Sequence, residues 1–290
     1  MRKAVHALLL AGLVLGPTLL AAGEYPVTVT DDRGARITIS ALPKRVVAVS
    51  ALYAQIVVDL EALDRLVAVG ESADNPAEVL DLPTVGPNYA PSVETILGFS
   101  PDLVLGASDY GGERAALESA GVTVVTTPWL TSVQSILDAV RTVAAALGAV
   151  PEGERLIEHI TREIIEAERL AIERDDVSAA FLYASTPNDP PYVAGSDAVE
   201  HELIVRAGGR NVFADVQWSS QVSFEEIISR NPAVIFVAPS QIENVLGNPN
   251  LQSVAAVANG RIVGIRASVV ASTRVAEALR AMVDALRGVE

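Results

Sequence analysis

Six aromatic side chains lie in loops that follow predicted strands or precede predicted helices, where a bulky ligand could be held. Aromatic residues make up only 4% of the chain. Because Ala, Val, Leu and Ile already supply a core, ligand binding accounts for the whole set better than packing does, although any one of them could simply pack. The predicted ligand-binding aromatic residues are Tyr53, Tyr89, Tyr110, Trp129, Tyr192 and Trp218.

Two arginines near the end of the sequence could bind an anionic group. Arg266 follows the predicted strand 262–265, and Arg274 lies near the start of the last predicted helix. A guanidinium group forms bidentate pairs with carboxylate, phosphate or catecholate oxygens. Arg274 is equally well explained as a surface residue at a helix start, so Arg266 is the predicted ligand anchor.

Glu94 and Glu225 occupy equivalent places in the two halves of the chain and have two interpretations. Acidic residues in the first turn of a helix are stabilised by the helix dipole, by about 0.3–1 kcal/mol each. Alternatively, two exposed carboxylates mark a face that meets paired arginines on a two-fold symmetric partner. The sequence leaves both interpretations open.

Motifs for catalysis, a cofactor or a metal are absent from the sequence. It contains no P-loop, no Gly-x-Gly-x-x-Gly after a strand, no Gly-x-Ser-x-Gly and no His-Glu-x-x-His. Of three histidines, His6 lies near the start, and His159 and His201 are predicted surface residues of helices. We therefore predict that the chain is not an enzyme, with no catalytic residue, no cofactor and no metal site.

The composition narrows the partners and the cellular location. The formal net charge is −15, which disfavours nucleic acid because such binding relies on Lys and Arg. With no cysteine in the chain, disulfides, thiolate metal sites and a lipid-anchoring cysteine are excluded. Residues 1–23 begin with Met1-Arg2-Lys3, continue with a short apolar run and end in small residues, as in a secretory signal peptide. We expect cleavage near Gly23 and a periplasmic protein that is not a lipoprotein.

Short apolar runs indicate an α/β fold in two parts. Residues 45–49, 66–69, 103–106 and 122–126 are apolar throughout, as in parallel strands covered on both faces, and predict an N-terminal lobe over 24–150. Residues 25–39 predict a β-hairpin at the edge of this lobe. Residues 151–176 have apolar positions at helical spacing and predict one long linking helix. The α/β pattern resumes in a C-terminal lobe over 177–290, with strands 179–184, 234–238 and 262–265 and helices 199–207 and 273–286.

An internal repeat supports this division. Residues 92–105 and 223–236 share serine, glutamate, isoleucine and proline at the same offsets. Each copy predicts a helix capped by Ser92 or Ser223, stopped by a proline just before a buried strand. Glu226 is expected to complete a capping box with Ser223.

The order and spacing of several segments resemble the helical-backbone periplasmic binding proteins, which serve ABC importers of cobalamin, ferric siderophores and haem. The segments are Arg45–Ser50, Leu63–Gly70, Pro83–Gly86, Ser92–Leu105, Ala207–Phe213 and Val222–Pro232, and the resemblance covers about residues 27–287. It implies two doubly wound α/β lobes joined by a single long α-helix, limited hinge motion and a ligand held in the cleft. It also implies that Glu94 and Glu225 contact permease arginines.

The predicted function is capture of a metal chelate and delivery to an ABC permease dimer with its ATPase subunits, by a monomer. Cobalamin and ferric siderophores rank together ahead of haem. Trp218 matches a tryptophan of the cobalamin-binding members, whereas their other tryptophan aligns near Asn88 and Tyr89. The alternatives are an exported α/β hydrolase using a carboxylate such as Asp109 or Asp189, and a structural module without small-molecule affinity.

Overall fold

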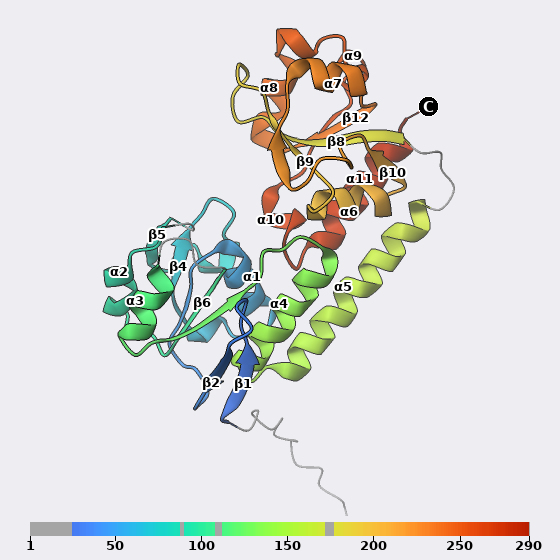
Figure 1. Cartoon of the computed structure of the whole chain (residues 1–290). Coiled ribbons are helices and arrows are strands. Elements are labelled where there is room, and N and C mark those ends of the chain that lie inside the picture. Colours follow the sequence, from blue (N-terminus) through green and yellow to red (C-terminus); the bar gives the residue numbers. More distant parts are fainter. Residues whose placement is uncertain (1–24, 88–89, 108–111, 172–176, 290) are drawn as a thin grey trace, which may run out of the picture.

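The chain folds into two α/β lobes connected by one long helix (Figure 1). The structure is a computed structural model that describes residues 25–87, 90–107, 112–171 and 177–289. The predicted signal peptide, residues 1–23, lies outside the described residues. The predicted fold class is confirmed.

The first lobe is built on a five-stranded parallel sheet in the order β5-β4-β3-β6-β7. Its strands are β3 (Val46–Ala48), β4 (Leu66–Glu71), β5 (Thr84–Pro87), β6 (Leu103–Ala107) and β7 (Thr123–Thr127). Its helices are α1 (Ala51–Asp59), α2 (Val93–Gly98), α3 (Glu113–Ser119) and α4 (Val133–Ala146). All of β3 is buried, with Val46 and Ala48 in one hydrophobic cluster and Val47 in another. The sheet is therefore covered on both faces, as its apolar runs predicted.

The predicted hairpin forms a separate two-stranded antiparallel sheet of β1 (Val27–Thr30) and β2 (Arg36–Ile39). It packs against α4 and β7. Gly34 in the turn has a positive φ of 75°, which glycine adopts without strain. The hairpin lies at the edge of the lobe, and its turn reaches the site described below.

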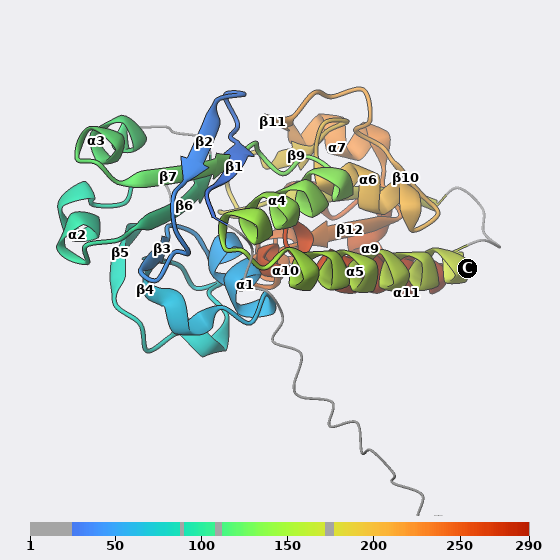
Figure 2. The ribbon, with the colours of Figure 1, turned by 90° about the horizontal axis from the view of Figure 1, so that it is seen from below.

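The linking helix α5 (Val150–Ala171) touches both lobes. It packs against α4 of the first lobe and α11 (Val275–Arg287) of the second, and Figure 2 shows α5 and α11 side by side. One face of α5 is buried through Ile157, Ile160, Ile164 and Ala167, as the helical spacing predicted. Residues 172–176, which we expected at its end, lie outside the described residues.

Gly153 allows α5 to approach α4 closely, because a Cβ placed there would lie 2.5 Å from the Cβ of Ala144. Replacing Gly153 with valine is expected to push the helices apart and to lower the free energy of unfolding by about 2–3 kcal/mol. Glu158→Val, at an exposed position of the same helix, controls for helix propensity and should cost less than about 1 kcal/mol. Urea denaturation measures both, and equal losses would contradict the close-packing role.

The second lobe has a mixed sheet in the order β11-β9-β8-β12-β13, with β10 pairing to β8. Its strands are β8 (Val177–Tyr183), β9 (Tyr192–Ala194), β10 (Gly209–Asn211), β11 (Ser219–Gln221), β12 (Val234–Val237) and β13 (Ile262–Gly264). Besides α11, its helices are α6 (Val199–Arg206), α7 (Phe224–Arg230), α8 (Ile242–Leu246), α9 (Ala255–Ala258) and α10 (Ala267–Val270). The parallel strands β8, β12 and β13 were predicted. The antiparallel edge formed by β9 and β11 was not.

Short 3₁₀ turns complete the described secondary structure. They span Leu63–Arg65, Ala77–Val79, Pro239–Gln241 and Pro249–Leu251. In the residues that the structure covers, no helix combines the length and the apolar character needed to cross a membrane.

The repeated helix–strand unit is present in both lobes. The Ser92 hydroxyl accepts the Thr95 N–H at 3.1 Å, and the Ser223 hydroxyl accepts the Glu226 N–H at the same distance. The expected capping box in the second copy is only half formed, because the Glu226 carboxylate pairs with Arg230 one turn later at 2.6 Å. The serine caps fix where α2 and α7 begin, so Glu94 and Glu225 lie in their first turns.

Candidate ligand-binding site

A cavity of about 280 Å³ lies at the carboxyl ends of the first-lobe strands. Val49 and Ser50 follow β3, Gly106 belongs to β6, and Thr126 belongs to β7. In the order β5-β4-β3-β6-β7, the chain changes direction across the sheet between β3 and β6. A crevice forms at such a switch point because the connections leave on opposite faces. The cavity therefore lies among loops that follow the predicted strands, which is where a ligand was expected.

The second lobe closes one side of this cavity. Ser268 of α10 contributes to its wall, together with Ala271 and Ser272 just after that helix. Figure 1 shows α10 beside α1 and the connection that precedes α4. A ligand held here would therefore touch both lobes.

The described cavity wall is largely apolar with dispersed polar groups. The apolar part includes Leu52, Val104, Pro128, Trp129 and Leu130, and the polar part includes Ser50, Gln55, Ser72, Asp74, Glu113, Arg114 and Ser272. The Ser50 hydroxyl makes no capping bond although Ser50 is the N-cap of α1, whose first turn lines the cavity. Such a wall suits a bulky ligand with apolar faces and hydrogen-bonding groups at its rim.

Two of the predicted aromatic residues, Tyr53 and Trp129, line the cavity. Trp129 is 39% exposed and presents a flat surface. Tyr53 is only 1% exposed, and its hydroxyl lies 2.5 Å from the Thr127 hydroxyl. Burial raises the pKa of Tyr53 well above that of an ordinary phenol. Tyr53 therefore stays protonated at neutral pH and is suited to packing rather than to metal ligation as a phenolate.

The other predicted ligand contacts lie elsewhere or outside the described residues. Tyr192 of β9 is 49% exposed, Trp218 before β11 is 60% exposed, and neither lines this cavity. Arg266 is exposed at the start of α10, two residues before Ser268, and does not line it either. Tyr89 and Tyr110 lie outside the described residues. Ligand contact stays a prediction for these five residues and equally for Tyr53 and Trp129.

The alternative candidates are engaged in local contacts. Arg274 forms two hydrogen bonds of 2.7 Å with the carboxylate of Glu277 one turn later on α11, which fits the surface role considered for it. Asp189 accepts a hydrogen bond from the Thr186 hydroxyl at 2.7 Å and does not line the cavity. Asp109 lies outside the described residues.

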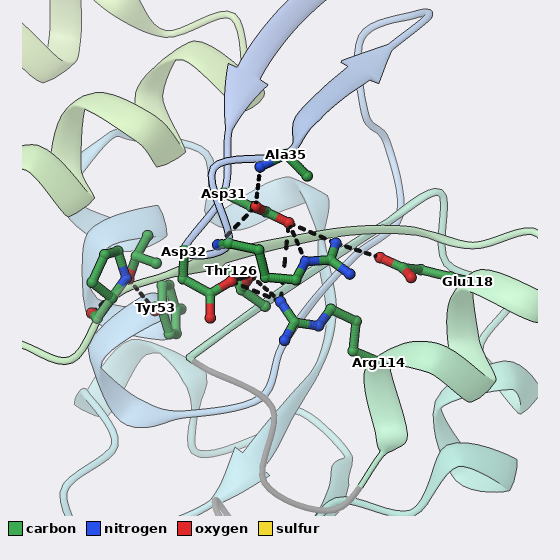
Figure 3. A network of polar contacts seen from close by, with 10 residues as sticks. Asp31, Asp32, Ala35, Tyr53, Arg114, Glu118 and Thr126 are labelled. Atoms are coloured by element: carbon green, nitrogen blue, oxygen red, sulfur yellow. Dashed lines mark hydrogen bonds and ion pairs between the residues drawn. The ribbon is translucent and has the colours of Figure 1, made fainter.

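A partly buried polar network borders the cavity and was not predicted from the sequence. Figure 3 shows Asp31, Asp32, Arg114 and Thr126 joined by hydrogen bonds and ion pairs, and Glu118 joins them through Arg33. Arg114 Nη1 lies 2.7 Å from Asp32 Oδ1 and 2.9 Å from the Thr126 hydroxyl. Of these residues, only Thr126 could be placed near the cavity from the sequence, since it lies at the end of a predicted strand. The contacts themselves could not be predicted, because the partners are far apart in the sequence.

Hydrogen bonds join the two lobes at two places. At the first, the Thr273 hydroxyl donates to Asp59 Oδ2 of α1 at 2.5 Å, and Gln55 of the cavity wall donates to the same carboxylate at 2.8 Å. Burial raises the pKa of the Asp59 carboxyl group. At the second, Glu202 of α6 accepts the N–H of Val133, the first residue of α4, at 2.8 Å.

The sequence matches a profile of the periplasmic binding protein family over residues 46–269, which is most of the chain. The chain belongs to this family.

Relatives of this periplasmic binding protein agree with that assignment. The uncharacterized ABC transporter substrate-binding lipoprotein YvrC of Bacillus subtilis is 26% identical over 73% of this chain and 68% of its own length. The vitamin B12-binding protein of Salmonella typhi is 29% identical over 63% of this chain and 70% of its own length. Among solved structures, the periplasmic heme-binding protein RhuT of Roseiflexus sp. RS-1 has a TM-score of 0.77 and 29% identity, covering 84% of this chain and 99% of RhuT.

Family membership confirms the expected general role. The chain is a solute-binding protein of the cobalamin, siderophore and haem group, acting with an ABC importer outside the cytoplasm. The similar proteins are substrate-binding transport proteins and not enzymes, which leaves the hydrolase alternative without support. The prediction that the chain is not a lipoprotein stays a prediction, since YvrC is described as a lipoprotein.

The described residues hold no cluster of three or more His, Asp or Glu side chains suited to bind a metal ion. His159 is exposed and lies 3.0 Å from Arg162, and half-buried His201 lies 3.2 Å from Asn211. Neither lines the cavity.

Proposed function

We propose that this periplasmic binding protein captures cobalamin in the cavity at the ends of β3, β6 and β7 and delivers it to an ABC importer. The composition of the cavity wall supports cobalamin over the other chelates, because the wall is largely apolar and has hydrogen-bonding groups but little net positive charge. Ferric siderophores and haem are the competing ligands.

The charge of the described wall favours a ligand whose rim is neutral. Its acidic side chains are Asp74 and Glu113, and its cationic side chain Arg114 is paired with Asp32. Haem carries two propionates, and ferric catecholates are anionic. Burying either ligand against this wall would leave its negative charge without a compensating cation. The rim of cobalamin carries amides, which the hydroxyl groups of Ser50 and Ser72 can bind. We propose that exposed Arg266 meets the phosphate of the ligand's nucleotide loop.

The proposed contact with the corrin face comes from Trp129. Its exposed ring and the neighbouring Leu130 and Pro128 form an apolar surface in the cavity. Large flat side chains bind macrocycles through area burial and stacking. We propose Tyr53 as support beneath this surface, and Tyr192 and Trp218 as contacts of the second lobe with the parts of the ligand outside the cavity.

We propose that Glu94 and Glu225 dock on arginines of the permease dimer. Both carboxylates are exposed on α2 and α7, which lie at the ends of their lobes away from α5 in Figure 1. Leu97 and Ile228, each three residues after its glutamate, are 37% and 38% exposed. Residues three apart share a helix face. Each lobe therefore offers an acidic and an apolar group on one face.

We propose that the lobes move little on binding. The linking helix packs on both lobes, and the bonds from Thr273 to Asp59 and from Val133 to Glu202 join them. The proposed units are the lobes at 24–150 and 177–290 and the linking helix at 151–176, in a monomer whose signal peptide is removed near Gly23. Release would then require the transporter to separate the lobes.

Calorimetric titration of the purified protein with cyanocobalamin, haemin and several ferric siderophores tests this function. We expect one cyanocobalamin per chain, with binding at least about tenfold tighter than that of haemin or of any siderophore. Tighter binding of an anionic chelate would contradict the ligand, and no binding of any chelate would contradict the function.

A further inference from the structure

The turn of the first hairpin is anchored by a buried carboxylate. Asp31 Oδ1 accepts the N–H groups of Arg33 at 2.9 Å and Ala35 at 2.8 Å, and Asp31 Oδ2 accepts from Arg33 Nε at 2.8 Å. The Asp31 side chain is fully buried, and Arg33 also pairs with Glu118 of α3 at 2.9 Å. These bonds fix the backbone of the turn, and with it the position of the next residue, Asp32.

Asp32 directs its carboxylate to the back of the cavity wall. Its Oδ1 lies 2.7 Å from Arg114 Nη1, and the same nitrogen donates to the Thr126 hydroxyl at 2.9 Å. The Thr126 hydroxyl in turn donates to Asp32 Oδ1, which closes the triangle drawn in Figure 3. Arg114 and Thr126 line the cavity, whereas Asp32 does not.

This arrangement sets the charge that a ligand meets. The side chains of Arg114 and Asp32 are only 11% and 9% exposed, so solvent screens their interaction weakly. A guanidinium group on the wall would attract carboxylates strongly, but a carboxylate at 2.7 Å cancels most of that field at the distance of a bound ligand. The hairpin therefore acts on the electrostatics of the cavity without touching the ligand.

We infer that Asp32 is a positioning residue that determines specificity: by neutralising Arg114, it selects chelates with an amide rim over chelates with a carboxylate rim. This inference rests on the proposed function and deepens it. Asp32 lies before the segment matched by the family profile, residues 46–269. The selection would therefore come from a part of the chain outside that segment.

The test compares ligands of one shape that differ by a single charge. The probes are cyanocobalamin and its monocarboxylic acids, in each of which one peripheral amide has been hydrolysed. The quantity compared is the acid-to-amide ratio, which is the dissociation constant of an acid divided by that of cyanocobalamin. For the wild-type protein we expect a ratio of about ten for at least one acid. In Asp32→Asn the ratio should fall to about two or less, because the acid binds more tightly while the affinity for cyanocobalamin changes little.

A matched control removes the same charge from the same network at a different place. Glu118→Gln deletes a carboxylate that pairs with Arg33 and does not line the cavity. The acid-to-amide ratio of this variant should stay within about twofold of the wild-type ratio. A second variant, Arg114→Gln, leaves the Asp32 charge in place and should raise the ratio above that of the wild type. It keeps the inference testable if Asp32→Asn does not fold.

The outcomes separate this inference from the function on which it rests. If the wild-type protein binds neither cyanocobalamin nor its acids, the proposed function fails. If it binds cyanocobalamin but Asp32→Asn moves the ratio no more than Glu118→Gln does, only the inference fails. Equal weakening of amide and acid in Asp32→Asn would show a purely structural role and would also overturn it.

Discussion

Replacing Glu94 and Glu225 together with arginine is expected to reduce chelate uptake by about a hundredfold while chelate affinity stays within about twofold. Both carboxylates are exposed in the first turns of α2 and α7, and neither lines the cavity. Charge reversal places arginine against the proposed permease arginines, and such like-charge contacts cost several kcal/mol. Uptake of radiolabelled cyanocobalamin into cells that carry the matching importer, together with titration of the purified variant, measures both quantities.

The matched control for this variant is Glu158→Arg with Glu166→Arg. Both residues are exposed on α5, so the net charge changes equally without altering the two repeated helices. Uptake by this control should stay within about threefold of the wild-type value. If charge reversal at Glu94 and Glu225 instead lowers the melting temperature and the affinity while uptake per bound ligand is kept, the two glutamates serve only their helices.

Replacing Trp129 with alanine is expected to weaken cyanocobalamin binding by about 10- to 100-fold. Trp129 is the exposed aromatic side chain of the described cavity wall. Its loss removes an apolar contact and the stacking energy, together worth about 1.5–3 kcal/mol. The dissociation constant is measured by calorimetry, and a melting curve of the free variant should change little.

Two further variants sharpen this prediction. Trp129→Phe keeps a flat apolar ring and should recover most of the affinity. Trp218→Ala reports on the second lobe, since Trp218 is exposed but does not line the cavity; we expect a smaller loss, of about two- to fivefold. Wild-type affinity in Trp129→Ala would contradict the proposed site.

Most of the fold follows from local patterns in the sequence. The strands β3, β6, β7, β8 and β12 are largely buried, so their residues form mostly apolar runs in the sequence. The serine caps and the prolines before β6 and β12 define the repeated unit in the same local way. The strands β10 and β11 are polar segments of three residues, and β9, Tyr192–Ala194, is equally short. Short segments that lie outside a longer apolar run owe their strand form to neighbours in the sheet, which no local pattern predicts.

The candidate site was only partly predictable for a related reason. The expectation that a ligand is held in the loops after parallel strands led to Trp129 and Tyr53, which line the cavity. It could not identify Arg114, because its partner Asp32 lies 82 positions away in the sequence, in the turn between β1 and β2. The contribution of Ser268 and Ser272 depends on how the two lobes pack, which is set by α5 and α11 rather than by residues near the cavity.

A crystal structure of the protein with cyanocobalamin tests the central claim most directly. We expect the corrin ring to lie against Trp129, between the carboxyl ends of β3, β6 and β7 and the α10 segment, with the Asp32–Arg114 pair intact behind the wall. A second hollow lies between α5 and α11, lined by residues that include His159 and Arg280. A chelate bound there instead, or a first-lobe cavity that stays empty in crystals grown with saturating ligand, would contradict the account.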